Sequence, residues 1–155
     1  KRQLTGVFAR EWVQPLAQTL GNLGSQRAWV MHGSDGSDEL TTTGVSYVAE
    51  LKDGTVSTFE ITPEDAGIGR AAPEDLKGGE SEKNAAAITA LLAGEHGPYR
   101  DIVLYNAAAA LYVAGAAGEI KEGVAMAIES IDSGKAKQAL RKMLAITADD
   151  SGAGA

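Results

Sequence analysis

The chain has 155 residues, the size of about one domain. Acidic residues outnumber basic ones by 21 to 14, and the resulting net charge of −7 excludes a dominant basic face of the kind that binds nucleic acid. The absence of cysteine excludes disulfide scaffolds, zinc ribbons, iron–sulfur sites and thiol catalysis.

The sequence shows no sign of a secretory or membrane-spanning segment. Its start is basic, but Glu11 and Trp12 interrupt it before the apolar run of a signal peptide. The longest weakly apolar stretch, residues 107–118, falls short of the roughly 20 residues that a membrane span needs. We therefore expect a cytoplasmic protein with neither a membrane nor a nucleic acid as its partner.

The first predicted elements are a strand, a helix and a second strand. Residues 3–8 form a short β-type run, and apolar residues then recur at intervals of three and four, which predicts a helix from near residues 10–12 to about Gly21. Pro15 fits this helix only in its first turn, where a missing N–H costs no hydrogen bond. The apolar run over residues 27–32 is typical of a strand buried on both faces. This order predicts a βαβ unit with parallel strands.

A β-hairpin is predicted next. Apolar and polar residues alternate over residues 45–51, Lys52-Asp53-Gly54 supplies a turn, and residues 55–61 return as the partner strand. Such a hairpin is either an appendage on the sheet or an extension of its edge. Residues 62–80 contain two prolines and four glycines, so they are expected to be mostly irregular.

The remainder of the chain is predicted to be helical. Hydrophobic residues make up 44% of the chain but aromatic residues only 5%, so we expect helices packed closely through small side chains. The predicted fold class is α/β, with part of a mixed, largely parallel sheet flanked by helices and a helical carboxyl-terminal half. Residues 1–147 are expected to form one unit and residues 148–155 a frayed tail. The helices are expected at about residues 81–94, 98–116, 120–132, and 133 or 134 to 146.

The densest cluster of polar residues, residues 32–39, directly follows the second predicted strand. Ligands of open α/β sheets bind beyond the carboxyl ends of strands. Three carboxylates within five residues repel one another unless a cation or hydrogen-bond donors lie among them, and hard oxygen ligands suit Mg²⁺. Asp38 and Glu39 are therefore candidate ligands of a phosphate-bridging Mg²⁺. The alternative is a solvated acidic turn in which Asp35 or Asp38 caps a following helix.

Other residues that could carry chemistry each have two interpretations. His32, at the end of a strand, is either a general base or a hydrogen-bonded structural histidine, and the second role is the commoner. His96 suits a cap or a surface position. Residues 67–72 match a dinucleotide-binding glycine pattern but lack its strand–turn–helix context. Asn84 and Asn106 lie within predicted helices, where an amide usually bonds a neighbouring loop and less often a ligand.

Several strings together resemble the carboxyl-terminal half of the anthranilate phosphoribosyltransferase family, enzymes of the tryptophan pathway. The most specific of them is His32-Gly33-Ser34-Asp35-Gly36-Ser37-Asp38-Glu39. The others follow in the family's order over nearly the whole chain: Lys1-Arg2-Gln3-Leu4-Thr5-Gly6-Val7, Ile61-Thr62-Pro63-Glu64-Asp65, Leu76-Lys77-Gly78-Gly79, Asn106-Ala107-Ala108 and Ile131-Asp132-Ser133-Gly134-Lys135-Ala136.

The resemblance implies a glycosyltransferase that moves the phosphoribosyl group of phosphoribosyl pyrophosphate to the amino group of anthranilate and releases pyrophosphate, with Mg²⁺ required. It implies that Asp38 and Glu39 hold a Mg²⁺ ion associated with the pyrophosphate, and it assigns no catalytic residue. It further implies that residues 1–147 are the carboxyl-terminal part of the large α/β domain of a nucleoside phosphorylase/phosphoribosyltransferase-like fold, in a homodimeric parent protein.

The family's glycine-rich phosphate-binding sequence Gly-Thr-Gly-Gly-Asp and its Lys-His-Gly-Asn-Arg segment are absent from this sequence. In the family these lie upstream of the matching region. We therefore expect the chain to be a fragment that is inactive by itself and that needs the amino-terminal half of the same protein as its partner.

Two alternative functions remain from the residues alone. One is a non-catalytic, nucleic-acid-binding relative of the same fold, which the net charge of −7 opposes. The other is a pyrimidine nucleoside phosphorylase-like enzyme, which the acidic cluster of residues 32–39 and the Pro63-Glu64-Asp65 string fit less well.

Overall fold

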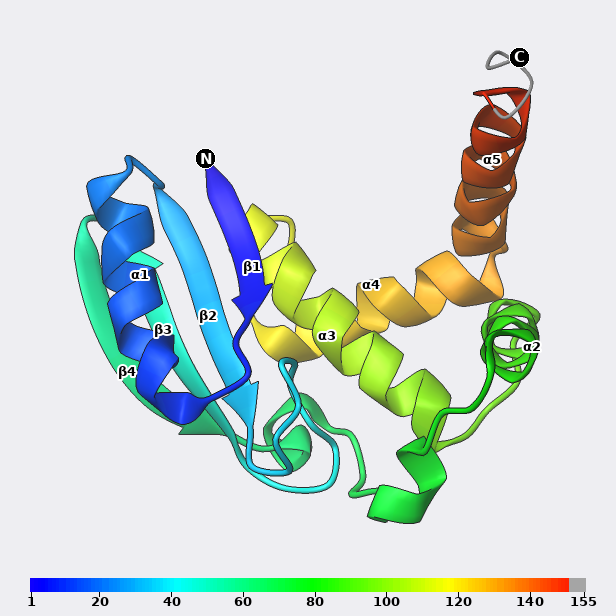
Figure 1. Ribbon diagram of the computed structural model, residues 1–155, viewed down its shortest axis with the longest axis horizontal. Coiled ribbons are helices and arrows are strands. Elements are labelled where there is room, and N and C mark those ends of the chain that lie inside the picture. Colours follow the sequence, from blue (N-terminus) through cyan, green and yellow to red (C-terminus); the bar gives the residue numbers. More distant parts are fainter. Residues whose placement is uncertain (151–155) are drawn as a thin grey trace.

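The computed structural model describes residues 1–150, in which the first half of the chain carries the strands and the second half the longer helices (Figure 1). Short 3₁₀ turns, η1 to η3, connect them. In chain order the elements are β1 (Arg2–Gly6), η1 (Arg10–Trp12), α1 (Val13–Asn22), β2 (Arg27–Gly33), β3 (Ser46–Lys52), β4 (Thr55–Ile61), η2 (Pro63–Ala66), η3 (Pro73–Leu76), α2 (Ser81–Leu92), α3 (Pro98–Ala114), α4 (Ile120–Asp132) and α5 (Lys135–Asp150).

The sheet has the strand order β1-β2-β3-β4. β1 and β2 are parallel and α1 connects them, which confirms the predicted βαβ unit. β3 and β4 extend the sheet beyond β2 as an antiparallel hairpin, closed by Asp53 and Gly54, whose φ angles of 50° and 76° suit a type I′ turn. The expectation of a mixed sheet is confirmed. The expectation of a largely parallel sheet is wrong within residues 1–150, because the β3–β4 hairpin is antiparallel both within itself and to β2, which leaves β1–β2 as the one parallel pair of this part of the chain.

Helices cover both faces of the sheet, which is why β2 is almost entirely buried, as its apolar run predicts. On one face Val30 packs with Val13 and Ala17 of α1. Trp29 and Met31 alternate with Val30 along the strand and point to the other face, where they join the core under α3. Figure 1 shows α1 and α3 on either side of the sheet.

Close packing of α3 against α4 depends on small residues. A Cβ atom at Gly123 would lie 2.8 Å from the carbonyl oxygen of Ala108 and 2.9 Å from its Cα, so a larger residue at this position would force the two helices apart. Ala108 and Ala127 are buried beside this contact. The expectation that alanine-rich helices pack through small side chains is confirmed.

Three elements end two residues earlier than predicted, among them α2, which ends at Leu92. β1 ends at Gly6 instead of residue 8, because the chain leaves the sheet after Val7 donates one hydrogen bond to Met31, and Phe8 is exposed. α3 ends at Ala114 instead of residue 116, because Gly115 adopts a left-handed conformation with φ of 78° and caps the helix.

α5 is longer than predicted and extends away from the sheet (Figure 1). It runs to Asp150 rather than to about residue 146, so the first residues of the expected tail are helical. Residues 151–155 of that tail lie outside the described residues. Neither α5 nor any other helix of residues 1–150 is long and apolar enough to cross a membrane.

Candidate functional site

The acidic segment, residues 34–45, connects β2 to β3 and starts at the edge of the sheet where the parallel strands β1 and β2 both end (Figure 1). It passes close to the end of β1: a Cβ atom at Gly6 would overlap the backbone carbonyl of Asp38. Glycine at position 6 therefore lets the segment lie against β1. This is the edge at which open α/β sheets bind their ligands.

Asp35 holds the acidic segment together. Its Oδ1 atom accepts hydrogen bonds from the Ser37 backbone N–H at 3.1 Å and from the Ser37 hydroxyl at 2.7 Å. Its Oδ2 atom accepts from the hydroxyls of Thr41 at 2.5 Å and Thr43 at 3.0 Å. Burial raises the pKa of Asp35, but the four hydrogen bonds together lower it by more than burial raises it. The pKa of Asp35 therefore lies below its usual value of 3.8.

Asp38 and Glu39 are exposed on the same segment, and their carboxylates accept no hydrogen bond from any side chain or backbone group within residues 1–150. Partial burial of the Glu39 carboxyl, together with the negative charges of Asp38 and Asp35, raises the pKa of Glu39. The three predicted acids thus separate into one carboxylate that organises the segment and two that lack compensating partners. The predicted alternative of a helix cap is wrong, since β3 and not a helix follows the segment.

The acidic segment forms one wall of an open cleft of about 680 Å³, a volume within the usual range of ligand sites. The opposite wall comes from η3 and the first turn of α3. Of the described residues that line the cleft, Lys77 is the only cation. The lining consists of Asp35, Gly36, Ser37, Glu39 and Thr43 on the acidic side, with Pro73, Glu74, Leu76, Lys77, Tyr99 and Ile102 opposite.

Asp38 and Glu39 fit a Mg²⁺ ion that is shared with a ligand. Within residues 1–150, no three acidic or histidine side chains gather closely enough to enclose a metal ion alone. Mg²⁺ is commonly held by one or two carboxylates together with water and substrate phosphates. Asp38 and Glu39 receive no hydrogen bonds within the described residues, and the pKa of Glu39 is raised. A divalent cation bound by the oxygens of these two carboxylates would stabilise their negative charge.

The other predicted candidates have structural contacts. His32 Nδ1 lies 2.9 Å from the carbonyl oxygen of Val7, and because a carbonyl only accepts, Nδ1 carries the proton. This confirms the interpretation of His32 as a hydrogen-bonded histidine. His96 is exposed, as expected for a surface residue. Gly67 is the left-handed cap of η2, so the glycine pattern over residues 67–72 has no dinucleotide-binding context.

Asn84 and Asn106 both bind backbone, as predicted for amides within helices. Asn84 Oδ1 accepts from the Gly79 N–H at 2.9 Å, and its Nδ2 donates to the Gly79 carbonyl at 2.8 Å. Asn106 makes the same pair of bonds to Leu40, each of 2.9 Å, and Nδ2 also donates to the Ile102 carbonyl at 3.0 Å. Asn106 therefore connects α3 to the acidic segment.

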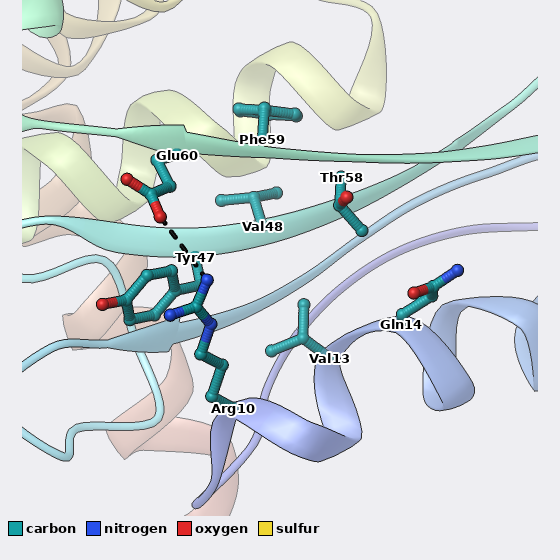
Figure 2. A pocket seen from close by; sticks show the side chains of 8 residues that line it. All are labelled: Arg10, Val13, Gln14, Tyr47, Val48, Thr58, Phe59 and Glu60. Atoms are coloured by element: carbon teal, nitrogen blue, oxygen red, sulfur yellow. Dashed lines mark hydrogen bonds and ion pairs between the residues drawn. The ribbon is translucent and has the colours of Figure 1, made fainter.

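A second hollow, of about 360 Å³, lies between α1 and the β3–β4 hairpin (Figure 2). In it the Arg10 guanidinium stacks on the Tyr47 ring, 3.6 Å from the ring centroid, and forms an ion pair of 3.5 Å with Glu60. The charge of Arg10 is thus matched by partners of its own chain. The acidic cleft, whose carboxylates lack such partners, is the stronger candidate for a ligand site.

Sequence reasoning missed Gly6, Lys77 and Tyr99. Gly6 contacts a residue 32 positions away, and Lys77 and Tyr99 reach the cleft from two different elements. No local pattern marks such contacts. The run Thr41-Thr42-Thr43 did offer a signal, because clustered hydroxyl donors beside three acids indicate that one of the acids is hydrogen-bonded.

Comparison with known proteins identifies the family and the fold of the chain. The model of the family described as "Glycosyl transferase family, a/b domain" matches residues 1–137. A curated protein named anthranilate phosphoribosyltransferase, from Parvibaculum lavamentivorans, is 65% identical over 147 residues, which cover 95% of this chain and 43% of that protein. The chain thus spans less than half the length of this relative.

Solved structures share the fold. The crystal structure of anthranilate phosphoribosyltransferase from Thermus thermophilus is 43% identical with a TM-score of 0.82, covering 90% of this chain and 41% of that one. Two variants of the Saccharomyces cerevisiae enzyme, one with Mg bound and one in complex with 4-fluoroanthranilate, are each 25% identical, with TM-scores of 0.78 and 0.79 and the same coverage.

Proposed function

Because the chain belongs to the glycosyl transferase family, a/b domain, we propose that it supplies the pyrophosphate-side metal site of an anthranilate phosphoribosyltransferase. The reaction forms a bond between the anthranilate nitrogen and C1 of the ribose, breaks the bond from C1 to pyrophosphate, and releases one proton from the amine. The observation that carries the proposal is the pair Asp38 and Glu39, which lacks compensating partners at the ligand-binding edge of the sheet.

Charge explains why this cleft needs a cation to accept pyrophosphate. Carboxylates of Asp35, Glu39 and Glu74 line it, against the single ammonium of Lys77 among the described lining residues. A polyanion would be repelled by such a surface. A Mg²⁺ ion held by Asp38 and Glu39 would supply the positive charge that stabilises the departing pyrophosphate.

The proposal gives the charged residues in and beside the cleft distinct roles. Asp38 and Glu39 hold the metal ion, and Asp35, through its bonds to Ser37, Thr41 and Thr43, keeps the segment that carries them folded. Lys77, on the opposite wall, complements phosphate charge directly. The structures of relatives with Mg or 4-fluoroanthranilate bound support these ligand classes.

We propose that residues 1–147 are the carboxyl-terminal part of an α/β domain whose other residues complete the site. The chain spans 43% of the length of the Parvibaculum relative and contains no Gly-Thr-Gly-Gly-Asp sequence to bind phosphate. Residues 1–155 alone should therefore fail to turn over substrate, and adding the amino-terminal half of the protein should restore activity. A turnover by residues 1–155 alone that matches the intact protein would contradict this.

The resemblance also supports a homodimer in the cytoplasm for the intact protein. A cytoplasmic location agrees with the substrate, because a polyanion such as phosphoribosyl pyrophosphate crosses membranes poorly. Sedimentation of the intact protein should give twice the monomer mass, and a monomer at micromolar concentration would contradict the dimer. Cell fractionation tests the location.

The function is tested with the intact natural protein, anthranilate and phosphoribosyl pyrophosphate. Loss of anthranilate fluorescence and release of pyrophosphate should proceed in equal amounts, should require Mg²⁺ and should stop when a chelator is added. No anthranilate consumption, combined with phosphate-dependent cleavage of a pyrimidine nucleoside, would favour the phosphorylase instead. No observation in residues 1–150 favours a nucleic-acid-binding function, and the acidic lining of the cleft opposes it.

A further inference from the structure

Asn106 binds the backbone of Leu40, the residue that follows Asp38 and Glu39, through two hydrogen bonds. Its Oδ1 accepts the Leu40 N–H and its Nδ2 donates to the Leu40 carbonyl, both at 2.9 Å, so the amide side chain satisfies both backbone groups of Leu40. The third bond, from Nδ2 to the Ile102 carbonyl at 3.0 Å, fixes the orientation of the amide on α3. The acidic segment and α3 are thus held in one arrangement although 66 residues separate Leu40 from Asn106.

The side chain of Leu40 is also fully buried, in the core between the sheet and α3 that contains Trp29 and Met31. Glu39 directly precedes Leu40, so the position of the Glu39 Cα follows from where Leu40 is held. On the other side of the pair, the Asp38 backbone lies against Gly6. The pair itself is exposed and has no hydrogen-bond donors of its own among the described residues, so its placement depends on these backbone contacts.

From this geometry we infer that Asn106 is a positioning residue for the metal-binding pair Asp38–Glu39, acting through the Leu40 backbone. The inference rests on the proposed metal site. Groups that orient metal ligands without touching the metal commonly contribute 10- to 100-fold to metal affinity or activity. Removing the Asn106 amide should therefore weaken metal binding by about 10-fold or more while both metal ligands remain present.

The chain offers a matched control. Asn84 makes the same two-bond grip on the Gly79 backbone from α2, with bonds of 2.9 and 2.8 Å, but Gly79 is neither adjacent to an acidic pair nor part of the lining of the cleft. Asn84→Ala therefore removes the same pair of backbone bonds elsewhere, although Asn84 is exposed and Asn106 is half-buried and makes a third bond. A loss of metal binding that comes only from removing such a pair of bonds would affect both folded variants, whereas a positioning role affects the metal site in Asn106→Ala only.

The test measures Mn²⁺ binding to the intact natural protein by the loss of the free-ion electron paramagnetic resonance signal, with and without phosphoribosyl pyrophosphate. Circular dichroism first establishes that the variants are folded at the assay temperature. Asn106→Ala should raise the Mn²⁺ dissociation constant about 10-fold or more, Asn84→Ala should leave it unchanged, and Asp38→Ala should abolish binding at this site. If Asn106→Ala does not fold, Asn106→Ser, whose hydroxyl is too short to hold both groups of Leu40, should show a shift in the same direction.

The outcomes distinguish the positioning role of Asn106 from the existence of the metal site. Wild-type Mn²⁺ affinity in folded Asn106→Ala or Asn106→Ser, together with lost binding in Asp38→Ala, overturns the positioning role alone. An equal loss in Asn84→Ala and Asn106→Ala also overturns it, because the effect would then be one of general stability. Wild-type affinity in Asp38→Ala overturns the metal site itself and this inference with it.

Discussion

Gly6 and Asp38 lie so close that a single methyl group on Gly6 would occupy the space of the Asp38 carbonyl. The contact joins the end of β1 to the segment that carries the acidic pair, across 32 positions of sequence. It explains how the last residue of a short strand contributes to the candidate site without offering a side chain to it.

Gly6→Ala should displace the acidic segment. Because the obstructing atoms belong to backbone, the segment rather than a flexible side chain must move, and we expect a loss of about 1–3 kcal/mol in the free energy of unfolding. Urea unfolding of the intact protein measures it. Gly69→Ala is the matched control, since nothing lies within 4 Å of a Cβ at that position. Equal unfolding free energies for the two variants would show that the close contact is not maintained in solution.

Asp35→Asn should change how stability depends on pH. The hydrogen-bonded carboxylate has a pKa below its usual value of 3.8, so its stabilising effect is complete above that unfolded pKa and is lost as the pH falls through the lower folded pKa. At pH 7 the variant should lose about 1–2 kcal/mol, a modest value because the segment is partly exposed. The difference from wild type should shrink toward pH 3 in urea unfolding. A difference that stays constant from pH 7 to pH 3 would contradict the role of the ionised carboxylate.

Asp132→Ala should destabilise the contact between the start of α3 and the end of α4. The Arg100 side chain is only 3% exposed and donates to Asp132 at 2.7 Å, so removing the carboxylate leaves a buried guanidinium with the longer bond to the Gly94 carbonyl. We expect a loss of about 2–3 kcal/mol in the free energy of unfolding, because Asp132 itself is half exposed. Glu129→Ala removes the exposed partner of Lys135 and should cost clearly less, because water screens an exposed ion pair. A smaller loss for Asp132→Ala than for this control would contradict the account.

The pattern of the sequence predicts local elements well where glycine and apolar spacing agree. α4 begins and ends at the predicted residues because Gly118 and Gly134 bracket an amphipathic run. It predicts less well where tertiary contacts decide. The β3–β4 hairpin pairs with β2, and two of the three strand pairs within residues 1–150 are therefore antiparallel. The polar end of α5 continues as a helix, although the sequence there has no apolar periodicity.

For the candidate site, the sequence identifies Asp38 and Glu39 as potential ligands, but it does not show that Asp35 has a different, structural role. That role depends on hydrogen bonds from the Thr41 and Thr43 hydroxyls to Asp35, which a linear pattern does not reveal. A hydrogen bond from Asn106 to a neighbouring loop could be predicted, because an amide inside an apolar helix needs hydrogen-bond partners. Its partner, Leu40, could not, since 66 residues intervene.

The most direct test of the central claim is the Mg²⁺ dependence of phosphoribosyl transfer to anthranilate in the intact protein, comparing wild type with Asp38→Asn and Glu39→Gln. Each variant removes one negative charge without changing the size of the side chain. We expect the Mg²⁺ concentration for half-maximal activity to rise about 10-fold or more and the urea midpoint to stay near that of wild type, because both side chains are exposed.

Asp53→Asn, an exposed acid in the β3–β4 turn, provides the control and should behave as wild type. A wild-type Mg²⁺ requirement in folded Asp38→Asn and Glu39→Gln would contradict the assignment of the metal site to this pair.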